Sequence, residues 1–238
     1  MNKELRLDKF LADMGKGTRS ALKEAVRKGR VRVNGEVIKK ADIKVRIPGD
    51  TVTLDGEEVA YAVMEYYMLN KPQGVVSATE DKKYPTVLDL IADKKRKDLF
   101  PVGRLDYNTS GMLILTNDGD LTYRLTHPRH QVTKTYRALV SGVLSKEKLF
   151  RLRKGVDIGG FVTSPAQVKI IRQAERSAVV DITIHEGKNR QVRKMFAAVG
   201  NPVQELQRTA IGDLRLGRLK EGHYRKLTRN EIEYLKNL

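Results

Sequence analysis

The chain has 238 residues, with 46 Lys or Arg against 29 Asp or Glu, a formal net charge of +17 and a pI near 10. This excess favours a polyanionic partner, and nucleic acid over a membrane surface, because tryptophan and any apolar run of 18 residues are absent. The absence of cysteine excludes disulfides and thiolate metal sites, and we expect no metal. The N-terminus lacks the apolar core of a signal peptide, so we expect a cytoplasmic protein.

Two short helices and a hairpin are predicted within residues 1–60. Apolar residues at helical spacing predict the first helix, and they are Leu7, Phe10, Leu11 and Met14. Thr18 is suited to cap a second helix, whose inward face is predicted to hold Ala21, Leu22, Ala25 and Val26. Alternating residues around Asn34-Gly35 predict a hairpin over 31–38, and a turn at 48–50 leads into a strand at 51–54.

The second predicted helix carries a stripe of positive charge opposite its apolar face. The stripe consists of Arg19, Lys23, Arg27 and Arg30, at steps of four, four and three residues. A solvated helix face usually mixes both signs, but only Glu24 lies nearby in the sequence. The pattern therefore favours contact with phosphates over a merely solvated face.

This region resembles the S4 RNA-binding domain. The matching residues are Arg6-Leu7-Asp8, Leu11, Gly15, Arg19 and Gly29-Arg30-Val31-Arg32-Val33-Asn34-Gly35. The resemblance implies a small module that grips structured RNA. Thr18-Arg19-Ser20 stands where that family often has Ser-Arg-Arg, so one cation is missing from the usual RNA face.

Residues 61–238 form the second predicted domain, in which strands and helices follow one another without a regular alternation. Strands are expected at 66–69, 112–116, 135–140, 166–172 and 177–184. Helices are expected at 86–92, 119–125, 145–154, 189–199 and 229–237. This order predicts an α+β fold: a small S4-like α/β domain, then a domain built on a mixed, largely antiparallel sheet.

Three segments of the second domain carry candidate chemistry. A turn-rich loop at 103–111 presents Asp106 beside Arg104, and an alternating strand at 132–138 presents Tyr136. A glycine-led turn at 186–195 enters a basic helix that contains Arg193. Each alone has a plain structural explanation, as a surface ion pair, a half-buried tyrosine or a solvated helix flank. Together, in so basic a chain, they suggest an acid, an aromatic platform and an arginine around an extruded nucleotide.

The second domain is similar to the RsuA-like family of ribosomal-RNA pseudouridine synthases. The matching segments are Leu69–Gly74, Phe100–Asp106, Thr109–Gly111, Leu115–Gly119, Lys134–Tyr136 and Glu186–Arg193. The S4-like module followed by this domain is the family's usual layout. The resemblance implies isomerisation of uridine to pseudouridine within RNA, in which the N1–C1′ bond breaks, the uracil turns and C5 bonds to C1′. It implies no cofactor.

The resemblance also assigns roles to individual residues. Asp106 matches the catalytic aspartate, and two roles stay open for it: attack on C1′, or removal of the 2′ proton to give a glycal. Tyr136 matches the tyrosine that stacks on the base and accepts the C5 proton. Arg193 matches the basic residue that pairs with the aspartate, and Arg104 is expected to displace or hold the nucleotide. Lys188 and Arg190 are expected to contact RNA, together with the N-terminal stripe.

Several alternatives remain at this point. A non-catalytic RNA-binding or ribosome-assembly protein would share the charge and the first domain, but has no use for the set Asp106, Tyr136 and Arg193. A methyltransferase lacks support because no glycine-rich cofactor loop follows a strand, and a two-metal nuclease because carboxylates are not clustered. Asn189-Arg190-Gln191 resembles the large-subunit members of the family more than the small-subunit ones, and this resemblance implies 23S rather than 16S rRNA as substrate, either free or in a ribosome-assembly intermediate. We expect a monomer.

Overall fold

The computed structural model describes residues 3–61, 64–94 and 97–238. The chain divides into two compact units, the first formed by 1–65 and 92–99, the second by 66–91 and 100–238. The predicted boundary at 60/61 assigned all later residues to the second domain, whereas residues 92–99 group with the first unit. Near the end of that segment the Lys97 amide donates a hydrogen bond to the carbonyl of Asp13, at 3.4 Å.

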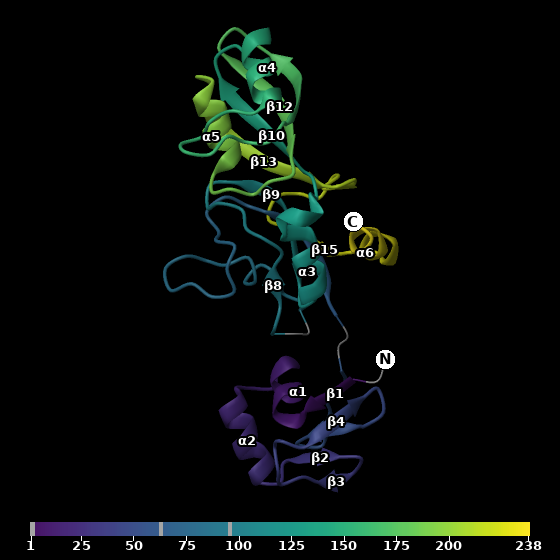
Figure 1. Ribbon diagram of the computed structural model, residues 1–238. Coiled ribbons are helices and arrows are strands. Elements are labelled where there is room, and N and C mark those ends of the chain that lie inside the picture. Colours follow the sequence, from purple (N-terminus) through teal and green to yellow (C-terminus); the bar gives the residue numbers. More distant parts are fainter. Residues whose placement is uncertain (1–2, 62–63, 95–96) are drawn as a thin grey trace. The chain divides into compact units, whose positions relative to one another are not determined.

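The first unit packs two helices against short strands (Figure 1). The predicted helices are confirmed as α1 (Leu7–Asp13) and α2 (Arg19–Arg27), and the Thr18 hydroxyl caps α2 by accepting from the Ala21 amide at 3.2 Å. β1 (Lys3–Arg6) pairs with β4 (Lys44–Ile47). A second sheet has the order β3-β2-β5-β6, formed by β2 (Val31–Val33), β3 (Glu36–Val37), β5 (Val52–Leu54) and β6 (Glu57–Glu58).

The predicted hairpin in this unit is confirmed by its turn. Asn34 and Gly35, between β2 and β3, have φ angles of 52° and 84°. A turn with positive φ at both central residues matches the twist of the flanking strands, which is why Asn-Gly predicts it well.

The second unit is built on one sheet that joins nine of the described strands. The main path has the order β11-β12-β10-β13-β9-β7-β15, while β8 pairs with β9 and β14 with β13. All these pairs are antiparallel except β13 with β9, which confirms the α+β class and the largely antiparallel sheet. The strands are β7 (Tyr66–Lys71), β8 (Phe100–Pro101), β9 (Ser110–Thr116), β10 (Lys134–Ser141), β11 (Gln167–Gln173), β12 (Ser177–Ile184), β13 (Val203–Ile211), β14 (Leu214–Arg215) and β15 (Tyr224–Lys226).

Helices complete two hydrophobic cores in this unit. α4 (Lys146–Lys154) and α5 (Gln191–Ala198) supply Leu152 and Phe196 to a core with the alternate residues of β10 and β12. α3 (Gly119–Thr126) and α6 (Arg229–Lys236) supply Leu125 and Leu235 to the other core, which includes residues of β7 and β9. A short 3-10 helix, η1 (Pro128–His130), follows α3. The four predicted helices in these regions are confirmed, although α5 begins two residues late because Arg190 adopts φ 52°.

Two expectations for the second unit differ from the structure. The helix predicted at 86–92 is wrong: Thr86–Ile91 forms successive turns, and the Asp89 carboxylate accepts bonds from the amide and hydroxyl of Thr86 at 2.7 and 3.0 Å. Such local side-chain bonds compete with a helix. β13 was not predicted, although it connects the two halves of the sheet. Its sequence carries Glu205, Gln207 and Arg208, which obscure the alternation expected of a strand.

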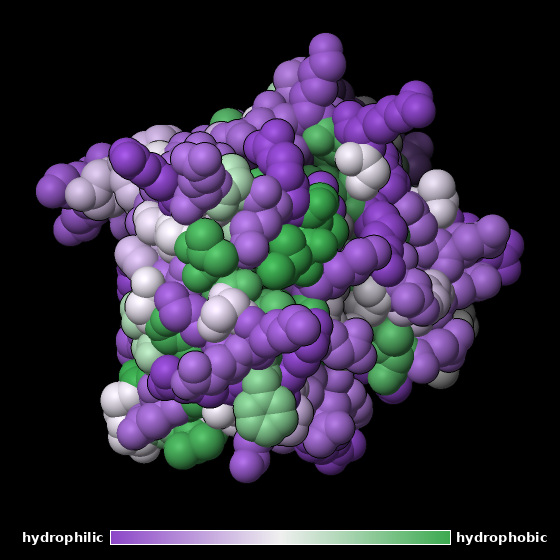
Figure 2. Space-filling model, turned by 90° about the horizontal axis from the view of Figure 1, so that it is seen from above, coloured by the Kyte–Doolittle hydropathy of each residue, from purple (hydrophilic) through white to green (hydrophobic). Residues whose placement is uncertain are grey.

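The face seen from above relative to Figure 1 is largely polar. Hydrophilic side chains cover most of this face, and hydrophobic ones are exposed between them, near its centre and towards the lower left (Figure 2). Within residues 3–61, 64–94 and 97–238, no helix is both long and apolar enough to span a bilayer.

Candidate active site

The loop that carries Asp106 lies between β8 and β9 and is fixed by backbone contacts on both sides. The Ser77 hydroxyl accepts from the Leu105 amide at 3.1 Å and donates to the Leu105 carbonyl at 2.9 Å. The Thr109 amide bonds to the Asp106 carbonyl at 3.0 Å and closes a turn, and the Gly74 amide bonds to the Tyr107 carbonyl, also at 3.0 Å. The carboxylate of Asp106 is therefore presented from a rigid turn rather than from a free loop.

A buried lysine lies behind this loop. Lys71, the last residue of β7, is fully buried, and its ammonium donates to the carbonyls of Pro72 and Thr109 at 2.8 and 3.0 Å. Burial lowers the pKa of Lys71 to about 8, while the charges of Asp106 and Glu221 act in the opposite direction. Sequence reasoning did not assign Lys71 to the site. The available signal was a lysine two residues after the predicted apolar strand 66–69.

Asp106 and Tyr136 line one cleft, as the sequence predicted. The cleft has a volume of about 90 Å³ and is also lined by Arg104, Lys188 and Arg190. Tyr136 reaches it from β10, and the turn at 187–190 closes one side. The side chain of Asp106 is 31% exposed, which leaves its carboxylate accessible to a ligand in the cleft. The rest of the wall is formed by Leu105, Thr109, Ile184, Gly187, Gln191, Val192 and Leu206. We call this space the catalytic cleft.

The two arginines near Asp106 make different contacts. Arg190 lies closer, with its Nη1 atom 3.9 Å from Oδ2 of Asp106 and 3.4 Å from Oδ1 of Asn108. Arg193 instead donates to the Asn108 carbonyl at 2.7 Å and to the Thr109 hydroxyl at 3.4 Å. Between the described residues Arg193 and Asp106 there is no ion pair within 4.0 Å. The direct pairing expected of Arg193 therefore stays a prediction, while its observed contact is with the backbone of the catalytic loop.

Electrostatic coupling still links Arg193 to Asp106. Burial and the neighbouring charge of Arg190 lower the pKa of Arg193, and the charge of Asp106 acts in the opposite direction. An arginine remains charged despite such a shift. The acid thus has Arg190 3.9 Å away, while Arg193 binds the backbone of its loop.

The turn before α5 is held by a polar network that sequence reasoning did not single out. Glu186 accepts from the amide and hydroxyl of Ser164 at 3.1 and 2.8 Å, and from the amide nitrogen of the Gln191 side chain at 2.6 Å. The Gln191 side chain in turn accepts from the Lys188 amide at 3.0 Å. Lys188 and Arg190, both expected to contact RNA, are therefore placed at the cleft by a rigid turn.

Arg104 and Lys188 line the cleft, and neither forms an ion pair with a carboxylate of another described residue. Arg104 is exposed and makes no hydrogen bond or ion pair with another described residue. The Lys188 ammonium lies 4.5 Å from the ring centre of Phe161. Both remain available for the RNA contacts predicted for them.

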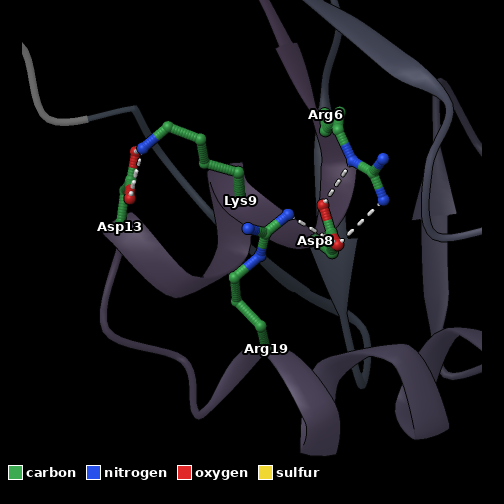
Figure 3. Close-up of polar contacts among 5 residues, drawn as sticks. All are labelled: Arg6, Asp8, Lys9, Asp13 and Arg19. Carbon is green, nitrogen blue, oxygen red and sulfur yellow. Dashed lines mark hydrogen bonds and ion pairs between the residues drawn. The ribbon is translucent and has the colours of Figure 1, made fainter.

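The predicted stripe of the first unit is exposed but largely paired with acids. Arg19 bonds to Asp8 at 2.9 Å, and Arg6 contacts the same carboxylate, as Figure 3 shows. Arg27 pairs with Glu24, and Arg30 pairs with Asp55. Lys23 makes no ion pair with another described residue. The sequence suggested a stripe with one nearby acid, whereas folding adds Asp8 and Asp55. RNA contact by Arg19, Lys23, Arg27 and Arg30 stays a prediction.

Comparisons with known proteins place this geometry in a family. Residues 65–198 match the model of the RNA pseudouridylate synthases, and residues 5–52 match the S4 domain. A Bacillus subtilis protein described as the uncharacterized RNA pseudouridine synthase YtzG is 44% identical over 97% of this chain and 98% of its own. The chain is also similar to a crystal structure of a pseudouridylate synthase, with 36% identity, a TM-score of 0.67, and coverage of 97% of this chain and 99% of that one.

Relatives named for both ribosomal subunits are similarly close. Ribosomal large subunit pseudouridine synthase B of Bacillus subtilis is 38% identical over 98% of this chain and 96% of its own. Ribosomal small subunit pseudouridine synthase A of Yersinia pestis is 40% identical over 96% of this chain and 97% of its own. Overall identity therefore does not separate the two substrates.

Proposed function

This chain belongs to the RNA pseudouridine synthases, and we propose that it isomerises a specific uridine of ribosomal RNA to pseudouridine, in 23S rather than 16S rRNA. The observation that carries the proposal is the catalytic cleft, which is lined by Asp106 with its accessible carboxylate, by Tyr136 and by Arg190. An extruded base needs a π-surface to stack on, and its sugar needs a reactive group within reach.

The proposed reaction moves one glycosidic bond from nitrogen to carbon. Asp106 either attacks C1′ or removes the 2′ proton, and in both cases the N1–C1′ bond breaks and the uracil is freed to turn. C5 then bonds to C1′ as the Asp106–C1′ bond breaks, or, in the second route, as Asp106 returns the proton to C2′. The proton leaving C5 is balanced by protonation of N1. Tyr136 stacks on the uracil and accepts the C5 proton. Arg190 and Arg193 place positive charge close to Asp106 in either role.

The preference for 23S rRNA rests on one short motif. Asn189-Arg190-Gln191 is more similar to the large-subunit members of the family than to the small-subunit members. In this structure the motif forms the junction between the cleft turn and α5, where Arg190 faces Asp106. The first unit is proposed to hold a structured part of the same RNA, either free or in a ribosome-assembly intermediate.

Tritium release from [5-³H]uridine-labelled 23S and 16S transcripts tests the proposal. We expect the wild-type protein to release tritium from 23S rRNA, and Asp106→Asn to release none while its affinity for RNA stays within about twofold, because Asn keeps the shape but not the charge. Appreciable release by Asp106→Asn would contradict the role of the acid. Release from 16S rRNA alone would overturn the preference for 23S.

A further inference from the structure

A second cavity adjoins the catalytic cleft and has a different chemical character. Its volume is about 160 Å³, and it shares Arg104, Tyr136 and Gly187 with the cleft. Lys134 and Arg208 contribute its further positive charges, from the neighbouring strands β10 and β13. The two spaces therefore meet at the aromatic ring proposed to stack on the uracil.

Arg208 is a buried cation with incomplete hydrogen bonding. It is 4% exposed, and its Nε atom donates to the Met112 carbonyl at 2.8 Å. Its Nη2 atom is buried and has no hydrogen-bond partner. A buried donor without an acceptor costs free energy, and more so when it carries charge. Arg208 lines the second cavity, so an acceptor that enters this cavity from outside the chain would lie close to the incompletely bonded guanidinium.

Lys134 lacks a partner as well. Its side chain forms no hydrogen bond or ion pair with another described residue, and the charge that acts on it is that of Arg208. Burial and that charge lower the pKa of Lys134 to about 8. Two cations thus face one small space, which destabilises the protein unless an anion lies between them.

The wall contains one carboxylate, and its hydrogen-bonding capacity is used elsewhere. Glu186 lines the second cavity, but its two oxygens accept the three bonds from Ser164 and Gln191 described above. It makes no ion pair with Lys134 or Arg208, all three being described residues. The anion that these cations require is therefore not supplied by the wall.

The backbone fixes Arg208 close to the catalytic loop. β13 and β9 run parallel and pair at Arg208 and Gly111, five residues after Asp106. A Cβ atom on Gly111 would lie 2.3 Å from the Arg208 carbonyl oxygen, so only glycine permits this approach. Tyr136 is the residue opposite Arg208 on β10. The strand that follows the Asp106 loop, the strand of Tyr136 and the strand of Arg208 are thus directly paired.

We infer that the second cavity binds a backbone phosphate of the RNA, next to the uridine in the catalytic cleft, through Lys134 and Arg208. This inference rests on the proposed function and deepens it by naming where the neighbouring nucleotide is held. The phosphate supplies acceptors for the guanidinium of Arg208 and for the ammonium of Lys134, and charge-assisted bonds of this kind position a nucleic acid without reading its sequence. Arg104, at the junction of the two spaces, lies between phosphate and base.

The variant Lys134→Met tests the inference because it removes the charge, keeps the length of the side chain and breaks no recorded hydrogen bond. We expect its affinity for 23S rRNA in filter binding to fall about tenfold, the range of one charge-assisted bond. We also expect the slope of log affinity against log salt to decrease in magnitude by about 0.7 to 0.9, the value for one phosphate. Lys146→Met, at an exposed position of α4, is the control for loss of one charge and should leave both quantities nearly unchanged.

The kinetics provide a second readout that a purely structural role would not move. In single-turnover tritium release, Lys134→Met should raise the half-saturating enzyme concentration about tenfold and leave the maximal rate within about twofold. Binding and slope equal to those of Lys146→Met would overturn the inference. A wild-type protein that releases no tritium would contradict the proposed function, while the binding comparison would still decide whether the cavity holds a phosphate.

Discussion

The two units of this protein each contain a buried charge cluster, and the clusters differ in whether the chain itself completes them. In the first unit the fully buried carboxylate of Asp8 receives bonds from Arg6 and Arg19 (Figure 3). In the second unit Lys134 and Arg208 line a cavity, and neither pairs with Glu186, the carboxylate in its wall. A completed cluster stabilises the fold, whereas an incomplete one indicates where an external ion binds.

Burial affects the two clusters in opposite ways. For Asp8, burial raises the pKa, but the hydrogen bonds from Arg6 and Arg19 outweigh it and hold the pKa below its ordinary value. For Lys134 no bond opposes burial, and its pKa falls to about 8. The charged form is thus favoured at Asp8 and disfavoured at Lys134.

The largest expected effect on stability comes from Gly111→Ala, which disrupts the strand pairing that holds Arg208. Its Cβ would overlap the Arg208 backbone at a φ of +109°, so we expect a loss of about 4 kcal/mol or more in urea unfolding. Gly35→Ala is the control, because its φ is also positive, at +84°, but no atom lies within 4 Å of the added carbon. Equal losses in the two variants would show that strand contact at Arg208 is not the cause.

Asp8→Asn should have the next largest effect, because it opens the completed cluster. We expect a loss of about 1–3 kcal/mol near neutral pH, limited by the partial exposure of the two arginines. Since folding lowers the pKa of Asp8, its contribution is present above the ordinary value of 3.8 and is lost as the pH falls through the lowered value. Chemical unfolding of both proteins across this range measures the difference. Glu24→Gln, at an exposed pair, should change stability far less.

Lys134→Met should change stability in the opposite direction. Removing an unpaired, half-buried charge is expected to raise the free energy of unfolding by about 1–3 kcal/mol at neutral pH. Because folding lowers the pKa of Lys134 from 10.5 to about 8, the penalty is complete below the lower value and disappears as the pH rises towards the higher one. The two unfolding curves should therefore converge at alkaline pH. A destabilised variant at neutral pH would mean that Lys134 is already satisfied within the fold.

The smallest expected effect concerns the stripe of the first unit. Lys23 has no recorded acidic partner, whereas Arg27 pairs with Glu24. We expect Lys23→Met to lower the salt slope of RNA binding by about 0.7 to 0.9, and Arg27→Met by less, since Glu24 already offsets that charge. Filter binding over a salt series measures both. Identical slopes for Lys23→Met and wild type would remove this residue from the RNA surface.

The elements with a clear apolar period were predictable from the sequence, and those whose inward positions are polar were not. The spacing in α1 and α2 and the Asn34-Gly35 turn gave correct structure because local rules decide them. β13 was missed because one of its buried positions is the charged Arg208, and the helix at 86–92 failed because Asp89 bonds locally to Thr86. When a strand carries a buried polar residue such as Arg208, its sequence loses the regular alternation of polar and apolar residues by which strands are predicted.

The sequence grouped the candidate site residues but not their contacts, and the site itself stays a prediction. Asp106 and Tyr136 line one cleft, yet the arginine within 4.0 Å of the acid is Arg190 rather than Arg193. Asp8 and Asp55 neutralise part of the stripe from 11 and 25 residues away. Such pairings depend on tertiary folding, which no local spacing encodes.

Mapping of pseudouridine in rRNA from cells that lack this protein tests the central claim most directly. The account predicts that a uridine of 23S rRNA stays unmodified in these cells, that the wild-type chain restores its modification, and that Asp106→Asn, expressed at the same level, does not. Restoration by Asp106→Asn, or an unchanged pseudouridine pattern in cells without the protein, would contradict it.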